Sequence, residues 1–213
     1  MQKGEHFNVP LFSNAISHVP TIINNRNRGR WRDGLCDCFR LGFCHPSILN
    51  SMFCPLIMLG QIMTRMKLNW LGQPSTQQSE WERTFRTLVY ILIAIIVFNL
   101  LFGPPPPVTN SDGYVTIIET RPSVVVSLFN IANVVFGMFC LWLTCRVRGN
   151  VRSKYNIPES KCLGCEDFCC SFWCNCCTLA HMARQTVDYD LEQSACCTND
   201  GLNPLQNRHA VII

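Results

Sequence analysis

Two uncharged apolar segments constrain what this chain can fold into more than any other feature. Residues 87–103 are 17 residues without a charge, and residues 122–145 are 24. As helices these segments would rise about 26 Å and about 36 Å, against a bilayer hydrocarbon core of about 30 Å. Residues 104–107 between them are four prolines, which cannot continue a helix because proline lacks an amide hydrogen and clashes with the preceding turn. The sequence therefore predicts an all-α membrane protein built on a two-helix transmembrane hairpin.

The distribution of charge predicts how this hairpin is oriented. Only 15% of the residues are charged, against roughly 25% in soluble domains. Arg83 and Arg86 precede the first apolar segment, and four Arg and Lys residues follow the second within residues 146–154. The positive-inside rule then places both termini in the cytosol and the loop over 104–121 outside. We expect the plasma membrane as the location, and no signal peptide, because residues 1–30 lack an apolar stretch.

The rest of the chain divides by composition into segments around the hairpin. Residues 41–63 are also uncharged, but His, Pro, Asn and Gln interrupt them, so we expect interfacial or re-entrant short helices there rather than a third span. The basic residues before position 31 are interpreted as a solvated tail with no nucleic-acid partner. The predicted segments are a disordered basic tail (1–30), a first Cys-rich module (31–66), a linker (67–86), the two helices (87–103 and 122–145) with their Pro-rich outer loop (104–121), a basic juxtamembrane segment (146–161), a second Cys-rich module (162–186) and a disordered tail (187–213).

Fifteen cysteines are the second unusual feature of the chain. Stable disulfides are not expected for them, because cytosolic thiols are kept reduced. Metal ligation, S-acylation and packing remain as explanations, and vicinal cysteines near a membrane are typical acylation sites. The candidate acylation sites are Cys145, Cys169, Cys170, Cys196 and Cys197.

The spacing of the cysteines in the second module indicates a metal site. The module holds two C-x-x-C pairs, and Cys177 and His181 stand four residues apart, on one face of a helix. Thiolates and an imidazole at such spacing can hold zinc, although the segment between the two pairs is shorter than in familiar zinc folds. The predicted zinc ligands are Cys162, Cys165, Cys174, Cys177 and His181, with Cys36, Cys38, Cys44 and Cys54 as a second group. Which four of each set act together is left open.

The two modules resemble each other, and the predicted spans contain polar residues. Placing Phe53-Cys54 on Trp173-Cys174 aligns Leu59-Gly60-Gln61 with Leu179-Ala180-His181, which indicates a weak internal repeat.

Polar groups inside spans serve an ion path or a hydrogen bond between helices, and the hydrogen bond is the simpler interpretation. The residues concerned are Asn99, Asn130 and Asn133.

Several short motifs lie in and around these modules. They are Trp31 with the GLCDCF of residues 34–39, Cys54-Pro55, Gly60-Gln61-Ile62, the basic pattern of Arg148, Arg152, Lys154 and Tyr155, and the CTLAHMARQ of residues 177–185. In these motifs the chain resembles the cysteine-rich placenta-specific-eight family, which includes plant cell-number regulators and plant cadmium-resistance proteins. The chain departs from the family pattern at Leu56 and Ala180, where cysteines are usual, and at His181, where Gln is usual. The resemblance implies a small membrane protein linked to zinc or cadmium export, to calcium influx or to control of cell number, with no catalytic mechanism.

No nucleotide-binding loop, nucleophile triad or zinc-protease helix is present, and we expect no enzyme activity. One hypothesis is divalent-metal handling, in which a homo-oligomer of hairpins provides a route for the ion. A second is a non-transporting membrane adaptor for protein partners, folded by structural zinc, and a third is an S-acylated scaffold. The first two differ in whether bound metal exchanges.

Overall fold

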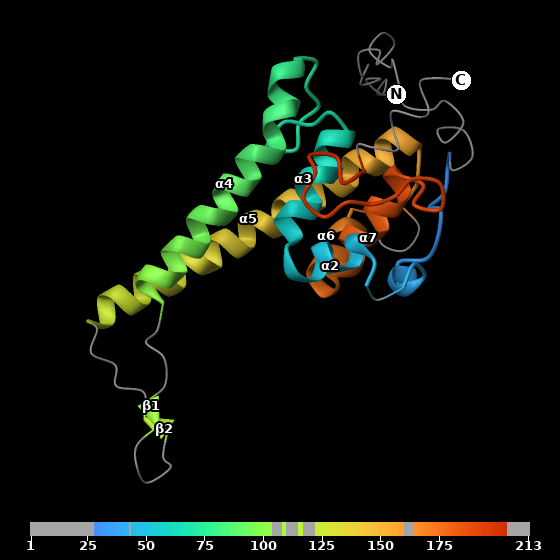
Figure 1. Ribbon diagram of the computed structural model, residues 1–213. Helices are drawn as coiled ribbons and strands as arrows, with labels where there is room; N and C mark the ends of the chain where they lie inside the picture. The colour runs from blue at the N-terminus through green and yellow to red at the C-terminus, as the bar shows by residue number, and fades with distance from the viewer. Residues whose placement is uncertain are drawn as a thin grey trace, which may run out of the picture.

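The computed structural model describes residues 28–42, 44–103, 108–109, 115–116, 122–159 and 164–203. It is mostly helical, as predicted, with two long helices and a smaller helical unit packed beside one end of them (Figure 1). Where the side chains can be described, the core of this unit lies between α3, α4, α5 and α7. The elements are η1 (Asp37–Phe39), α2 (Pro46–Phe53), α3 (Pro55–Arg65), α4 (Gln78–Phe102), β1 (Val108–Thr109), β2 (Val115–Thr116), α5 (Ser123–Tyr155), α6 (Glu166–Trp173) and α7 (Asn175–Thr186).

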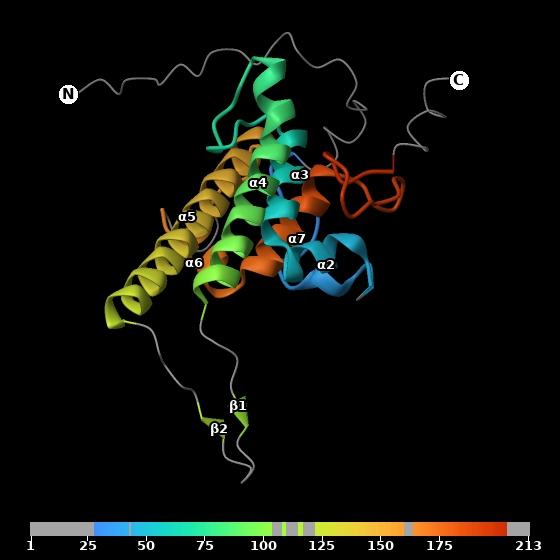
Figure 2. The ribbon, with the colours of Figure 1, turned by 60° about the vertical axis from the view of Figure 1, so that its left-hand side comes forward.

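The long helices α4 and α5 correspond to the two predicted spans. Each is long and apolar enough to cross a membrane, judged by length and composition. They extend away from the smaller unit in the same direction (Figure 2). Phe98 of α4 stacks on Phe129 of α5 with 5.6 Å between ring centroids. The antiparallel pair β1–β2 lies beyond their far ends. Apolar side chains remain exposed along both helices, among them Leu100 at 79% and Val134 at 66%.

Both long helices extend further than their apolar segments. The helix α4 begins at Gln78, inside the predicted linker, and α5 continues through the predicted juxtamembrane segment to Tyr155. The added residues include good helix formers such as Glu and Arg, and no proline interrupts them. The helix α5 ends where Asn156 adopts a left-handed conformation (φ 54°), a common helix terminator. The apolar stretch therefore marks where lipid is expected, and not where the helix ends.

The smaller unit contains the internal repeat that the sequence indicates. In each copy an eight-residue helix ends in an aromatic residue, and a cysteine then joins it to a second helix. The joining residues have nearly the same backbone, with φ −135° and ψ 64° at Cys54 and φ −143° and ψ 67° at Cys174. The repeat is therefore two helix–cysteine–helix units, α2–α3 and α6–α7.

The core of the smaller unit forms where these two repeats meet the basic ends of α4 and α5. Gly60 of α3 allows a close approach to α4, because a Cβ there would lie 3.2 Å from Phe85 Cδ2 and 3.4 Å from Leu88 Cδ1. The fully buried apolar residues come from four helices: Ile62 and Met63 of α3, Leu88 of α4, Leu143 and Val147 of α5, and Leu179 and Met182 of α7.

The predicted disordered tail after residue 186 is ordered over its described part, residues 187–203. Its backbone carbonyls accept hydrogen bonds from polar side chains of the first repeat: the Asn50 amide donates to Cys196 (2.7 Å), and the Gln61 amide donates to Cys196 (2.8 Å) and Thr198 (3.1 Å). Arg65 also donates to the carbonyl of Asp200. The polar sequence therefore forms a loop that satisfies buried amides. Residues 1–27 and 204–213 of the predicted tails lie outside the described residues.

Candidate metal centre

Three cysteines gather at the start of α7. The ligand atoms of Cys174, Cys176 and Cys177 all lie within 4.8 Å of one another, and the three side chains are half-buried. Cys174 is the N-cap of α7, and Cys176 and Cys177 belong to its first turn. Within the described ranges, this is the one group of three or more His, Cys, Asp or Glu residues whose ligand atoms come so close. The donor set is purely sulfur, which suits soft ions such as Zn²⁺ or Cd²⁺.

The same closeness allows a second chemical state. The structure joins Cys174 and Cys177 as a disulfide with a Cα–Cα distance of 5.4 Å, and Cys176 Sγ lies 4.0 Å from Cys177 Sγ. This pairing differs from the expectation of reduced thiols. Its cause is local: a C-x-x-C sequence that begins at a helix N-cap brings its two sulfur atoms to the same side of the first turn. Three thiols are available for a metal ion only when the pair is reduced.

His181, predicted as a ligand with these cysteines, lies in a buried site of its own. Its Nε2 is 2.9 Å from the Asp33 carbonyl oxygen, which can only accept, so Nε2 carries the hydrogen. Its Nδ1 is 3.5 Å from Arg148 Nη1, which can only donate. The ring also packs on Trp31, with 4.2 Å between centroids. Both nitrogens are therefore engaged, and the structure does not bring His181 to the cluster.

The remaining predicted ligands are dispersed among the described residues. Cys165 is the N-cap of α6, Cys54 joins α2 to α3, and Cys36 and Cys44 are exposed. Among the described members of the second predicted group, Cys36, Cys44 and Cys54, the ligand atoms do not come together as a metal site. Cys162 and the side chain of Cys38 lie outside the described part of the chain.

The predicted acylation sites differ in their surroundings. Cys145 contacts the Asp167 carbonyl (3.7 Å) from the end of the predicted span. Cys169 and Cys170 are half-buried in α6, and burial raises the pKa of the Cys170 thiol. Cys196 and Cys197 are exposed on the loop after α7 and are the easiest of the five to modify.

Two of the three polar residues in the predicted spans, Asn99 and Asn133, have described hydrogen bonds, and neither of these bonds joins the two helices. The Asn99 amide donates to the Ile95 carbonyl (2.7 Å), and the Asn133 amide donates to the Phe129 carbonyl (3.0 Å). Each bond stays within its own helix, and Asn130 is exposed on α5. The predicted interhelical hydrogen bond is therefore not formed by Asn99 or Asn133 in this conformation.

A buried ionic network next to His181 was not expected from the sequence. Arg148 is 2% exposed and lies 3.1 Å from Asp167, 3.8 Å from Glu166 and over the Trp31 ring at 4.5 Å. Burial raises the pKa of Asp167 above its usual value, although Arg152 and Arg148 act in the opposite direction. One signal was present, since Arg148 and Arg152 are four residues apart and the acidic pair at 166–167 follows shortly after.

The network extends to α7 and to the segment that precedes η1. Arg184 of α7 pairs with Asp33 (2.7 Å), and the Arg32 amide donates to the Gln185 side chain (2.8 Å).

The model of the PLAC8 family matches residues 31–185, so the match begins and ends at these contacts. The chain belongs to the PLAC8 family. The comparison with curated proteins and the comparison with solved structures give no match. In this PLAC8 family protein, Arg148, Arg184 and Gln185 thus join α5 and α7 to α6 and to the segment around Trp31.

Proposed function

We propose that this PLAC8 family protein is an integral membrane protein that binds a soft divalent metal ion, zinc or cadmium, on Cys174, Cys176 and Cys177 and exchanges it. The observation that carries the proposal is the group of three sulfur atoms within 4.8 Å at the start of α7. Sulfur-only donor sets select soft ions over magnesium and calcium. The metal would be held by these thiolates and would draw the first turn of α7 around it.

The number of ligands that the described part of the chain brings together favours exchange over a structural role. Structural zinc sites are closed by four protein ligands, whereas sites that exchange a ligand keep one position open. His181, one of the five ligands predicted for this module, is engaged by Asp33 and Arg148 instead. The smaller unit is also held together by ion pairs and an apolar core that need no metal. These features support metal handling rather than an adaptor folded by zinc.

The membrane assignment rests on the surfaces of α4 and α5. Their exposed apolar residues would be unfavourable in water over such an area and suit lipid. Exposed Arg83, Arg86 and Arg146 lie in the parts of the helices next to the smaller unit, which supports a cytosolic position for that unit under the positive-inside rule. The cytosol keeps thiols reduced, as metal binding by Cys174 and Cys177 requires. One hairpin cannot enclose a pore, so passage of the ion through the bilayer would need several copies.

The first test is the metal content of the full chain, purified in detergent under reducing conditions and measured by inductively coupled plasma mass spectrometry. We expect zinc near one ion per chain, and a loss of about tenfold or more in the variant Cys174→Ser/Cys177→Ser, since even outer-shell changes cost 10–100-fold in metal affinity. The matched control is Cys196→Ser/Cys197→Ser, an exposed pair outside the cluster, which should keep its zinc. Metal-free but folded wild-type protein, or equal zinc in both variants, would contradict the proposal.

A further inference from the structure

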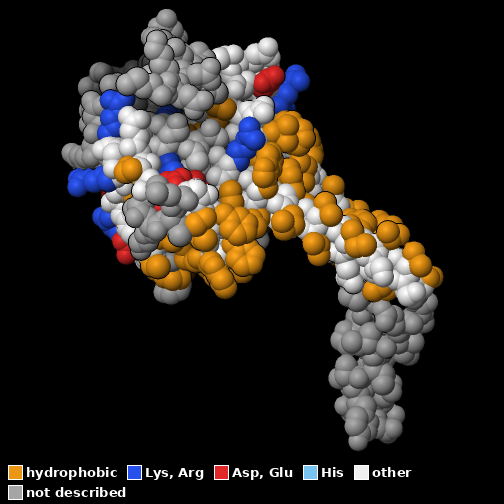
Figure 3. All heavy atoms as spheres, turned by 180° about the vertical axis from the view of Figure 1, so that it is seen from behind, with side chains coloured by type: hydrophobic (Ala, Val, Ile, Leu, Met, Phe, Trp, Pro, Cys, Tyr) orange, Lys and Arg blue, Asp and Glu red, His pale blue; other side chains and the backbone are white. Residues whose placement is uncertain are grey.

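The end of the smaller unit that points along the hairpin carries exposed aromatic residues. Phe53, the last residue of α2, is 75% exposed, and Trp173, the last residue of α6, is 82% exposed. Phe172 lies edge-on to Trp173 at 5.4 Å and stacks on Phe168 at 5.7 Å. The space-filling view shows apolar side chains gathered on this end, beside the hairpin (Figure 3). Each repeat turns once, the first at Cys54 and the second at Cys174. We call these two turns, with the aromatic residues that precede them, the aromatic vertices.

We infer that the aromatic vertices are a lipid-docking surface that enters the leaflet on the basic side of the membrane, next to α4 and α5. The inference rests on the proposed insertion of the hairpin. It adds a second membrane contact to that proposal, made by the Cys-rich repeats themselves.

The first vertex lies alongside the apolar part of α4. The Thr84 hydroxyl donates to the Leu68 carbonyl (2.9 Å), whereas Gly60 lies against Phe85 and Leu88. Earlier residues of α3 therefore meet later residues of α4, and the two helices run antiparallel. Pro55, the first residue of α3, precedes Gly60 by five residues and so lies about 7.5 Å further along α4 at 1.5 Å per residue, and Phe53 at the end of α2 adjoins it across Cys54. That position is beside the predicted span, which begins at residue 87.

The second vertex lies alongside α5 in the same way. The Asp167 carboxylate pairs with Arg148 and Arg152, and the Asp167 carbonyl, which points along α6, contacts Cys145. The helix α6 therefore runs toward the earlier, apolar part of α5. Its last residue, Trp173, is six residues on, or about 9 Å. Both vertices thus reach past the basic ends of the hairpin into the region where lipid is expected.

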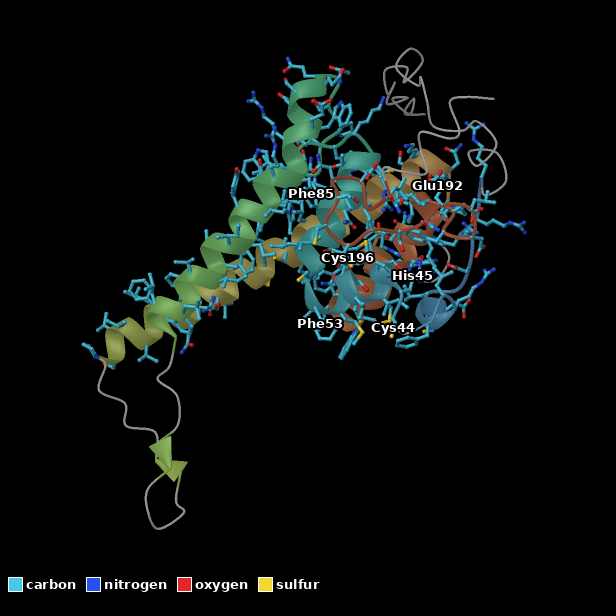
Figure 4. All side chains as sticks on the ribbon, viewed as in Figure 1. Cys44, His45, Phe53, Phe85, Glu192 and Cys196 are labelled. Carbon is cyan, nitrogen blue, oxygen red and sulfur yellow. A yellow bond between two sulfur atoms is a disulfide. The ribbon has the colours of Figure 1, made fainter. Side chains whose placement is uncertain are left out.

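The chemistry of the vertices fits an interface and not bulk water. The helix α2 carries no charged residue, and the charges of α6, Glu166 and Asp167, lie at its opposite end. Figure 4 shows Phe53 and Cys44 at this end of the smaller unit, and Glu192 at the other. Trp and Phe are favoured where headgroups meet acyl chains, and interfacial helices bury their apolar side about 5–10 Å deep. The apolar surface of the vertices also continues that of α4 and α5, so lipid is the occupant.

The test is quenching of tryptophan fluorescence in the full chain, reconstituted into phosphatidylcholine and phosphatidylserine vesicles that contain phosphatidylcholine brominated near the headgroup end of its chains. The chain has five tryptophans, so if they emit equally Trp173→Phe should lower the lipid-quenched intensity by up to about a fifth of the total tryptophan emission. The matched control is Trp81→Phe, because Trp81 lies on α4 six residues before the predicted span and against Lys67. It should leave the lipid-quenched intensity unchanged.

Alkaline extraction of the same vesicles separates the two proposals. If the protein stays in the vesicles and Trp173→Phe leaves the lipid-quenched intensity as it was, the vertices lie in water or against a protein, and the inference is overturned while the hairpin stands. If alkali releases the protein, the proposed membrane insertion is wrong and the docking surface is lost with it. Quenching of Trp173 in extraction-resistant protein is the expected result.

Discussion

Replacing Arg148 by alanine is expected to lower the free energy of unfolding by about 3–5 kcal/mol, because it breaks a buried ion pair from one side only. Arg148 is 2% exposed and faces Asp167 at 3.1 Å, Glu166 at 3.8 Å and the Trp31 ring. Without the guanidinium, buried Glu166 and partly buried Asp167 each lose an ion pair. The change should also weaken the packing of α6 on α5, which would then be joined through Arg152 and Asp167.

The measurement is denaturant unfolding of the detergent-solubilised protein, followed by circular dichroism. Arg146→Ala is the matched control: Arg146 is on the same helix but exposed, over the Trp142 ring at 5.3 Å, so its loss should cost about 1 kcal/mol or less. Equal effects of the two changes would show that the buried network does not stabilise the fold.

Acidification should destabilise the protein through His181. Burial lowers the pKa of His181 from 6.5 to about 4 in the folded state. Above pH 6.5 the ring is neutral in both states, so the folded state has its full stability. Between pH 6.5 and about 4 the His181 ring is protonated in the unfolded state and stays neutral in the folded state. The free energy of unfolding should therefore fall as the pH falls through this window, by about 3 kcal/mol.

The variant His181→Gln isolates this contribution, because glutamine does not titrate and can still donate to the Asp33 carbonyl. We expect the unfolding free energy of the wild type to fall more steeply than that of the variant across the window, with the two curves parallel above it. The profile is obtained from denaturant titrations at a series of pH values. Parallel curves over the whole range would mean that His181 is not buried as a neutral ring.

The fold was predictable from the sequence to the extent that it depends on local pattern. Apolar length and the prolines at 104–107 indicated the two long helices, and the alignment of Phe53-Cys54 with Trp173-Cys174 indicated the repeat. The start of α4 at Gln78 was not predicted, because polar residues continue a helix without leaving an apolar signal. The order of residues 187–203 was missed because it depends on Asn50 and Gln61, far away in sequence.

The candidate site was predictable only in part, for a similar reason. C-x-x-C spacing identified Cys174 and Cys177, whose closeness is set within one turn of α7. Spacing also placed His181 on a face with Cys177, but it does not say what that face contacts. Here it contacts Trp31 and Asp33, about 150 positions earlier in the chain. Cys176 was not predicted as a metal ligand, because the C-x-x-C spacing from Cys174 ends at Cys177.

The most direct test of the account compares the zinc affinity of Cys176→Ser with that of His181→Gln, by competition with a chromophoric chelator on reduced, detergent-purified protein. The structure places Cys176 in the three-sulfur group, whereas the two ring nitrogens of His181 contact Asp33 and Arg148. We predict that Cys176→Ser weakens zinc binding by about tenfold or more, while His181→Gln leaves it within about twofold of the wild type. Unchanged binding in Cys176→Ser together with lost binding in His181→Gln would contradict the account and return the site to the ligand set expected from spacing.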